Sequence, residues 1–240
     1  MALTRLDKLI TASGCATRSE AKALLRAGRV TVNGVPARSG EEKYDAATAE
    51  ICVDGRRLLN CAGNRYLMLH KPAGVLSATE DAAQKTVLDL LPAELRRFGL
   101  FPVGRLDKDT TGLLLLTNDG AFAHEVISPK RHVPKVYRAV VDRPLDAADA
   151  AAFAEGIVLR DGTRCLPAEL RIEAPREGLV TVCEGKYHQV RRMFAARGKN
   201  VTALRRERVG ALALDPALAP GEWRELGAAE RELALSGGNG

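Results

Sequence analysis

The stretch of sequence that decides the fold lies at residues 104–120 and reads GRLDKDTTGLLLLTNDG. Four consecutive leucines at 113–116 predict a buried strand, and the Thr-Asn-Asp-Gly sequence that follows predicts the turn that ends it. The segment before the leucines holds Asp107, with Arg105 and Lys108 beside it, between two glycines. A loop anchored on a buried strand runs over the surface, so its polar side chains cannot all be buried. We therefore expect chemistry at this loop, although an aspartate in such a position is often only a turn former.

Sequence patterns on both sides of this loop predict an α+β domain. Apolar runs and alternating patterns predict strands at residues 66–69, 113–116, 136–141, 166–172, 179–183 and 201–205, and helices at 86–91, 122–127, 147–154 and 188–196. Strands outnumber helices and do not strictly alternate with them, which favours a large mixed or mainly antiparallel sheet flanked by helices. We place this domain at residues 66–235, with a linker at 61–65 before it and a disordered tail at 236–240 after it.

The first 60 residues predict a small separate module. Thr4 is a candidate cap for a short helix whose apolar residues share one face. Thr17 and Glu20 have the spacing of a capping box, which predicts a second helix. Short alternating segments at 30–32 and 51–53, the first followed by an Asn-Gly turn, predict a small sheet.

Positive charge is concentrated in two parts of the chain. The chain has 36 Lys and Arg against 30 Asp and Glu, and residues 1–38 hold seven basic and two acidic residues. Residues 183–210 hold eight basic and two acidic residues, so the rest of the chain is acidic. Two basic regions on an acidic protein suggest a long polyanion such as nucleic acid, because each neutralised phosphate releases counterions.

The second predicted helix carries a basic ridge. Arg18, Lys22 and Arg26 recur every four residues, so they project from one side of the helix, and Arg29 extends the ridge. A rigid helix with evenly spaced cations can position a structured RNA through its phosphates without reading bases. A basic amphipathic helix that contacts another protein is the alternative.

The cysteines and the apolar runs limit where in the cell the protein can be expected. Five cysteines are widely spread without a Cys-x-x-Cys motif, which supports neither a zinc site nor a disulfide framework. No apolar run approaches the roughly 20 residues that span a bilayer, and the N-terminus lacks the apolar region of a signal peptide. We therefore expect a soluble, cytoplasmic protein without a membrane partner, and a monomer because nothing suggests an obligate interface.

Three motifs, taken in order, resemble those of the RsuA-type pseudouridine synthases. They are Gly104-Arg105-Leu106-Asp107, Lys135-Val136-Tyr137, and the sequence EGKYHQVRRMF at residues 184–194. The front module, over about residues 3–58, resembles the S-four-like RNA-binding domain. The resemblance covers nearly the whole chain, and it implies the pseudouridine synthase fold and an isomerase that acts on ribosomal RNA.

The resemblance also implies the site. The invariant aspartate of the family falls on Asp107, its active-site tyrosine on Tyr137 and its active-site basic residue on Arg191. These roles make chemical sense, because breaking and remaking a bond to the sugar calls for an ionised carboxylate, which a nearby guanidinium would keep charged. The rearrangement is redox-neutral and internal, so no cofactor or metal is expected. We expect RNA contacts from Arg5, Lys8, Arg18, Lys22, Arg26, Arg29, Arg105, Lys186 and Arg192.

Three other functions compete with this interpretation. Asp107 and Asp109 fit the first positions of a calcium loop, but its twelfth position is Asn118 instead of glutamate. A metal-dependent nuclease that uses Asp107, Asp109 and Asp119 is a second possibility. A non-catalytic RNA-binding or assembly factor is a third, and it would keep its function without the Asp107 carboxylate.

The target within ribosomal RNA rests on few residues. Tyr187-His188 before Gln189 resembles the small-subunit branch of the family, and the chain lacks a long basic C-terminal extension. We therefore expect one specific uridine of 16S ribosomal RNA as the substrate. A large-subunit (23S) ribosomal RNA synthase of the same family is the alternative.

Overall fold

The computed structural model describes residues 3–46, 48–58 and 64–237, and it divides into two compact units. Unit 1 comprises Met1–Arg65 and Leu91–Phe101, and unit 2 comprises Tyr66–Leu90 and Pro102–Gly240. Residues 61–63 of the expected linker, with Cys61, and residues 238–240 of the expected tail lie outside the described residues.

Unit 1 holds helices and short strands around a small core. The helices are α1 (Leu6–Ala12), α2 (Arg18–Arg26) and, from the second segment, the single turn α3 (Ala93–Arg96), and the strands are β1 (Leu3–Arg5), β2 (Val30–Val32), β3 (Val35–Pro36), β4 (Lys43–Asp45), β5 (Ile51–Val53) and β6 (Arg56–Arg57). Strands β3, β2, β5 and β6 form an antiparallel sheet in that order, and β1 pairs with β4. Leu6 and Ile10 of α1 are fully buried beside Leu25 of α2, and this packing presents the other side of α2 to solvent.

The start of α2 follows the predicted capping box, whereas the start of α1 does not follow its predicted cap. Thr17 Oγ1 accepts a hydrogen bond from the backbone N–H of Glu20, and the Glu20 carboxylate accepts one from the backbone N–H of Thr17. The prediction that Thr4 caps α1 is wrong. Thr4 lies in β1 opposite Tyr44, and the residue that precedes α1 is Arg5, whose side chain makes no cap hydrogen bond.

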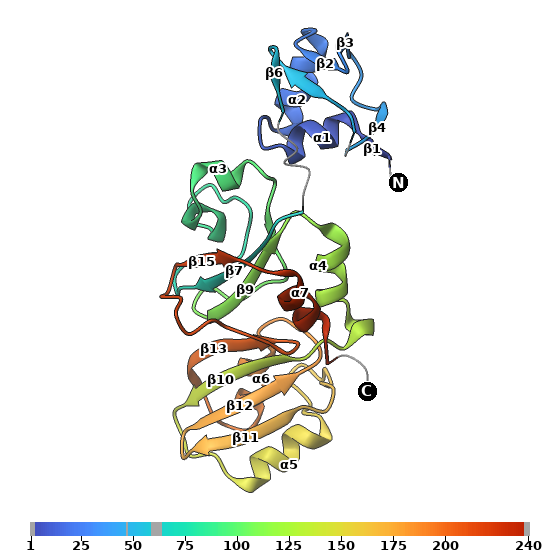
Figure 1. Ribbon diagram of the computed structural model, residues 1–240. Coiled ribbons are helices and arrows are strands. Elements are labelled where there is room, and N and C mark those ends of the chain that lie inside the picture. The colour runs from blue at the N-terminus through green and yellow to red at the C-terminus, as the bar shows by residue number, and fades with distance from the viewer. Residues whose placement is uncertain (1–2, 47, 59–63, 238–240) are drawn as a thin grey trace. The chain divides into compact units, whose positions relative to one another are not determined.

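Unit 2 is built on one large mixed sheet. Its strands are β7 (Tyr66–Lys71), β8 (Phe101–Pro102), β9 (Thr111–Thr117), β10 (Lys135–Val141), β11 (Glu169–Ala174), β12 (Glu177–Val182), β13 (Val201–Val209), β14 (Leu212–Ala213) and β15 (Trp223–Glu225). The main order is β11-β12-β10-β13-β9-β7-β15, with β14 on β13 and β8 on β9 (Figure 1). All pairs along this order are antiparallel except β13 with β9, which is parallel. This sheet confirms the predicted α+β class.

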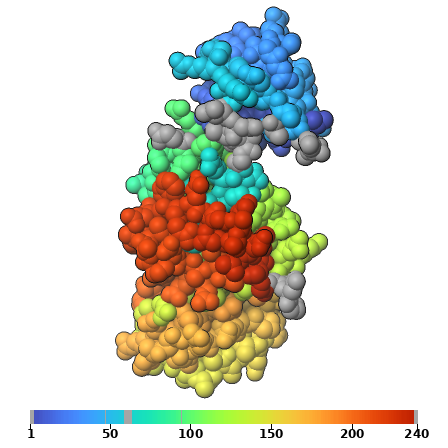
Figure 2. All heavy atoms as spheres, viewed as in Figure 1, coloured from blue at the N-terminus to red at the C-terminus, as the bar shows by residue number. Residues whose placement is uncertain are grey.

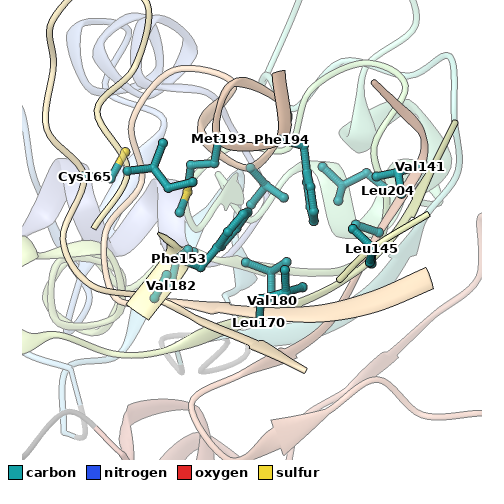
Figure 3. Packing of buried hydrophobic residues seen from close by; sticks show 14 of the residues in the cluster. Val141, Leu145, Phe153, Cys165, Leu170, Val180, Val182, Met193, Phe194 and Leu204 are labelled. Atoms are coloured by element: carbon teal, nitrogen blue, oxygen red, sulfur yellow. The ribbon is translucent and has the colours of Figure 1, made fainter. Parts of the chain in front are cut away.

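Helices pack on the sheet of unit 2. They are α4 (Gly120–Ile127), α5 (Ala147–Glu155), α6 (Gln189–Ala196) and α7 (Ala228–Leu235), with the 3-10 turns η1 (Val87–Leu90) and η2 (Pro129–Arg131). Phe153 of α5 and Phe194 of α6 are fully buried with ring centroids 4.9 Å apart, above Val180 of β12 (Figure 3). Burying one such ring contributes about 1.5–3 kcal/mol. This core fixes α6 on the sheet, and α6 carries Arg191.

The strand after the Asp107 loop is locked to β13 at a glycine. Gly112 in β9 has φ +102°, and a Cβ atom there would lie 2.2 Å from the carbonyl oxygen of Arg206 in β13. Only glycine allows the two backbones to approach this closely. The end of the Asp107 loop is therefore fixed relative to β13.

Several regions differ from the predicted elements. The strand expected at 166–172 is β11, which begins only at Glu169. The helix expected at 86–91 is the 3-10 turn η1, because the Asp89 carboxylate accepts hydrogen bonds from the backbone N–H and hydroxyl of Thr86, and Pro92 follows closely. At the C-terminal end, β14, β15 and α7 were not predicted. Figure 2 shows these C-terminal segments, in red, covering much of the visible face of unit 2.

Within the described part of the chain, every helix is too short or too polar to cross a bilayer.

Candidate active site

The backbone around Asp107 is held from beneath by a buried lysine. Lys71, at the end of β7, is fully buried, and its Nζ donates hydrogen bonds to the carbonyl oxygens of Pro72, Lys108 and Thr110 at 2.9, 3.0 and 3.0 Å. Burial lowers the pKa of Lys71 to about 8, and the negative charges of Asp109 and Asp107 oppose this shift. Lys71 therefore ties the Asp107 loop to the end of β7.

A second set of hydrogen bonds fixes the loop on the other side of Asp107. Ser77 Oγ donates to the carbonyl oxygen of Leu106 at 2.9 Å and accepts from its N–H at 3.1 Å. The N–H of Thr110 donates to the carbonyl oxygen of Asp107 at 3.0 Å. With both neighbours fixed, the Asp107 side chain projects from a rigid backbone, which is what a reacting group requires.

Two side chains of the EGKYHQVRRMF motif reach the Asp107 carboxylate. His188 Nε2 lies 3.4 Å from Oδ1, and Arg191 Nε lies 3.9 Å from Oδ2. Arg191 is oriented by a hydrogen bond from Nη1 to the carbonyl oxygen of Val201 at 3.1 Å. The Asp107 side chain keeps 30% of its surface exposed, so it remains accessible beside this cation.

A small cavity opens in front of the carboxylate. Its volume is about 80 Å³, and its lining includes Arg105, Asp107, Tyr137, Lys186 and His188. Four segments that are distant in sequence contribute: the Asp107 loop, β10, β13, and the segment that joins β12 to α6. The structure therefore brings together the three motifs that the sequence analysis singled out.

Tyr137 lies on β10 above a buried cation that sequence reasoning missed. Arg206 of β13 is 4% exposed, and its guanidinium carbon lies 6.0 Å from the centroid of the Tyr137 ring. Its Nη1 donates to the Tyr137 hydroxyl at 3.4 Å, and its Nε donates to the carbonyl oxygen of Leu113 at 2.8 Å. The Tyr137 oxygen thus accepts a hydrogen bond from a buried cation on the side away from its own O–H. The one sequence signal for the burial of Arg206 is its spacing of two residues from Leu204, which places both side chains on the same face of β13.

Hydrogen bonds and ion pairs of its own side chains hold the segment between β12 and α6. Glu184 Oε1 accepts from the backbone N–H of Leu166 at 2.9 Å and from Gln189 Nε2 at 2.6 Å. Its other oxygen pairs with Lys186 Nζ. Arg192 pairs with Asp161 at 2.5 Å. Lys186 and Arg192, expected as RNA contacts, therefore both hold ion pairs within unit 2.

The remaining expected RNA contacts lie at the surface. Arg105 is exposed at the rim of the cavity. In unit 1, a groove of about 640 Å³ is lined by Arg5, Lys8, Arg18 and Lys22, with Asp7, Thr11 and Ser19. Arg26 is also exposed on α2. The ridge predicted from the spacing on α2 is thus present as a solvent-facing row of cations.

Two of the expected cations in unit 1 are paired with acids. Arg29 donates to both carboxylate oxygens of Asp54, at 2.7 and 2.5 Å, and the pairing lowers the pKa of Asp54. Arg5 likewise donates to Asp7 at 3.1 and 2.7 Å. These two arginines form part of the surface, but their charges are already balanced locally, unlike the row on α2.

The geometry argues against the nuclease alternative. Asp119 accepts hydrogen bonds from the backbone N–H groups of Ala121 and Phe122 at 2.9 and 3.1 Å, and from the hydroxyl of Tyr66 at 2.7 Å. It is therefore the cap of α4, and both of its carboxylate oxygens accept hydrogen bonds. Across residues 3–46, 48–58 and 64–237, no three His, Cys, Asp or Glu side chains cluster as ligands of a metal ion.

Comparison with known proteins gives concordant matches along the chain. The family model described as RNA pseudouridylate synthase matches residues 65–196, and the model described as S4 domain matches residues 4–46. An uncharacterized RNA pseudouridine synthase of Bacillus subtilis, YtzG, is 47% identical, covering 96% of this chain and 97% of that protein. Ribosomal small subunit pseudouridine synthase A of Vibrio cholerae is 46% identical, covering 96% and 98%. A crystal structure of a pseudouridylate synthase superposes with a TM-score of 0.69 at 38% identity, covering 96% and 99%.

Proposed function

The chain belongs to the RNA pseudouridylate synthase family, and on that premise we propose that it converts one specific uridine of 16S ribosomal RNA to pseudouridine. The observation that carries the choice of RNA is the 46% identity to ribosomal small subunit pseudouridine synthase A of Vibrio cholerae, over 98% of that protein. The same synthase of Escherichia coli is 41% identical over a similar span. These relatives share both the catalytic part and the front module with this chain.

The reaction requires a carboxylate next to the ribose. The bond from N1 of uracil to C1′ breaks, the base turns over, and a bond from C5 to C1′ forms. The proton on C5 is lost and N1 gains one, so atoms and charge balance without an external reagent. Asp107 starts this sequence, either by attacking at the ribose or by removing a proton from it. Its fixed backbone and its exposed carboxylate support this role.

Arg191 and Tyr137 complete the catalytic set. Arg191, 3.9 Å from Asp107, aligns the carboxylate and balances its charge when the nucleotide excludes water. Tyr137 offers a flat ring to the released base and a hydroxyl that assists removal of the C5 proton. Arg105, exposed at the rim, contacts phosphate or occupies the space that the extruded nucleotide leaves in the RNA.

The two parts of the chain divide the work. Residues 66–235 form the catalytic domain, and residues 1–60 form the RNA-binding domain, which holds structured RNA through phosphates. The exposed cations Arg18, Lys22 and Arg26 on α2 supply this contact. Binding should weaken steeply with salt, because each phosphate contact releases a counterion. The enzyme acts as a monomer in the cytoplasm.

Mapping pseudouridines tests the choice of RNA. Ribosomal RNA from cells that lack the protein is compared with RNA from cells complemented with the wild type or with Asp107→Asn. We expect one pseudouridine of 16S RNA to disappear, to return with the wild type and to stay absent with the variant. Loss of a site only from 23S RNA would move the enzyme to the large-subunit alternative. Loss of no site, or rescue by Asp107→Asn, would support an assembly factor instead.

A further inference from the structure

One aromatic side chain beside the Asp107 cavity is exposed to solvent. Tyr187 is 76% exposed, and among the described residues it is the one aromatic side chain with this exposure. The residues on either side of it in sequence, Lys186 and His188, both line the cavity. A chain with only 4% aromatic residues thus displays one of them beside His188, whose imidazole lies 3.4 Å from the Asp107 carboxylate.

The Tyr187 ring is stacked on one face. It lies against the His188 imidazole with ring centroids 3.9 Å apart and an angle of 15° between the planes. That imidazole in turn lies 3.4 Å from Asp107. Because His188 covers one face and 76% of the residue stays exposed, the other face of the ring is open.

The backbone under this ring is fixed. Arg192 Nη1 donates to the carbonyl oxygen of Tyr187 at 3.4 Å, and the same guanidinium pairs with Asp161 at 2.5 Å. His188 has a left-handed backbone with φ 47°, a conformation that non-glycine residues adopt rarely and at a cost in free energy. A strained residue that holds an exposed ring in place indicates a binding role more than a packing role.

We propose that the open face of Tyr187 stacks on the base of a nucleotide next to the target uridine, and so holds the RNA in register while the target lies at Asp107. An exposed ring on a fixed backbone is the usual platform for an unpaired base. Stacking does not read hydrogen-bonding edges, so the platform positions the strand and selects for an unstacked neighbour. Arg192 acts here as a positioning residue for Tyr187. The inference rests on the proposed function only in needing an RNA that the enzyme modifies.

The test compares three variants of the full chain on 16S ribosomal RNA transcribed in vitro with tritium at C5 of uridine, since pseudouridine formation releases that label. Tyr187→Phe keeps the ring, Tyr187→Leu keeps apolar area without a ring, and Tyr187→Ala keeps neither. Base stacking on an aromatic side chain is worth about 1–3 kcal/mol, which corresponds to about 5–150-fold in affinity. We expect KM to rise by a factor in that range for the Leu and Ala variants and to stay within about twofold for Phe.

A single-turnover rate at saturating RNA separates positioning from chemistry. It should stay within about threefold of the wild type in all three variants. Leu233→Ala, which removes an exposed apolar side chain from α7, is the matched control and should change neither quantity. An unchanged KM in Tyr187→Ala, or equal KM values for Phe and Leu, would overturn the proposal.

A modified RNA identifies the stacked base. Replacing each neighbour of the target uridine in turn by an abasic residue should, at one position, raise the wild-type KM as much as Tyr187→Ala does. At that position the two changes together should have the effect of one alone. Full additivity at every position would also overturn the proposal. If the wild type modifies 23S RNA instead, that RNA replaces the probe, so a wrong target and a wrong platform give different results.

Discussion

Arg191 Nε lies 3.9 Å from Oδ2 of Asp107, although Asp107 lies in the loop before β9 and Arg191 lies on α6, far along the chain. The pair is partly shielded, with 27% and 30% of the two side chains exposed. Fully exposed pairs contribute only about 0–1 kcal/mol, and the contribution grows when a ligand excludes water. The charge of Arg191 should therefore matter most when RNA covers the site.

Replacing Arg191 by methionine should lower kcat on labelled ribosomal RNA by about 100-fold, as expected for loss of a preorganised electrostatic contact. KM should stay within about threefold. Arg191→Lys should retain more activity than Arg191→Met, because lysine keeps the positive charge. It should stay below the wild type, because lysine lacks the second donor that binds the Val201 carbonyl. Arg171→Met, which removes an exposed arginine paired with Glu173 on β11, is the control. Wild-type kcat in Arg191→Met would contradict the role given to this cation.

Replacing Tyr137 by phenylalanine removes the hydroxyl and keeps the ring. General acid–base catalysis contributes about 10²–10⁴-fold, so we expect kcat to fall by about 100-fold while RNA affinity is kept. Tyr137→Leu removes the ring as well and should fall further. Full turnover by the Phe variant, measured by release of the C5 label, would contradict a role of the Tyr137 hydroxyl and leave only the ring, which packs against the base.

Lys71 predicts a specific pH dependence of stability. The folded-state pKa is about 8 and the ordinary value is 10.5, so between these pH values the unfolded chain binds a proton that the folded chain has released. The free energy of unfolding of the wild type, relative to Lys71→Met, should therefore rise from pH 8 to pH 10.5, by up to about 3 kcal/mol. Denaturant titrations of both proteins across this range measure the difference. A difference that is flat or falls with pH would contradict the burial of this ammonium group.

Gly112 and Gly120 form a matched pair for a test of the sheet. A Cβ atom at Gly112 meets the Arg206 backbone at 2.2 Å, whereas one at Gly120, the first residue of α4, meets nothing within 4 Å. Gly112→Ala should lower the free energy of unfolding by about 3 kcal/mol or more, through the clash and the left-handed φ. Gly120→Ala should leave it unchanged or raise it by up to about 1 kcal/mol. Equal stabilities in thermal melts would contradict the close approach of β9 and β13.

Much of the fold was predictable because the local patterns were strong. The leucine run gave β9, the capping box gave α2, and β2 and β5 begin and end at the predicted residues. Elements at the C-terminal end, such as β15 and α7, were missed because they carry weak periodicity and form only by pairing with β7 or packing beside β14. Tertiary contacts decide such segments.

The site was predictable only in part. Motif order predicted Asp107, Tyr137 and Arg191 as site residues, and the structure places these three around one cavity or beside it. The supporting residues Lys71 and Arg206 were missed, because burial of a cation under backbone carbonyls depends on which strands become neighbours. The spacing of residues in the sequence does not show which strands become neighbours.

The most direct test of the account is a single-turnover measurement with Asp107→Asn. Asparagine keeps the size and the polar character of the side chain but removes its charge. We expect the variant to bind labelled ribosomal RNA within about threefold of the wild type and to form pseudouridine at a rate at least about a thousandfold lower. Pseudouridine formed by the variant at close to the wild-type rate would contradict the claim that the Asp107 carboxylate performs the chemistry.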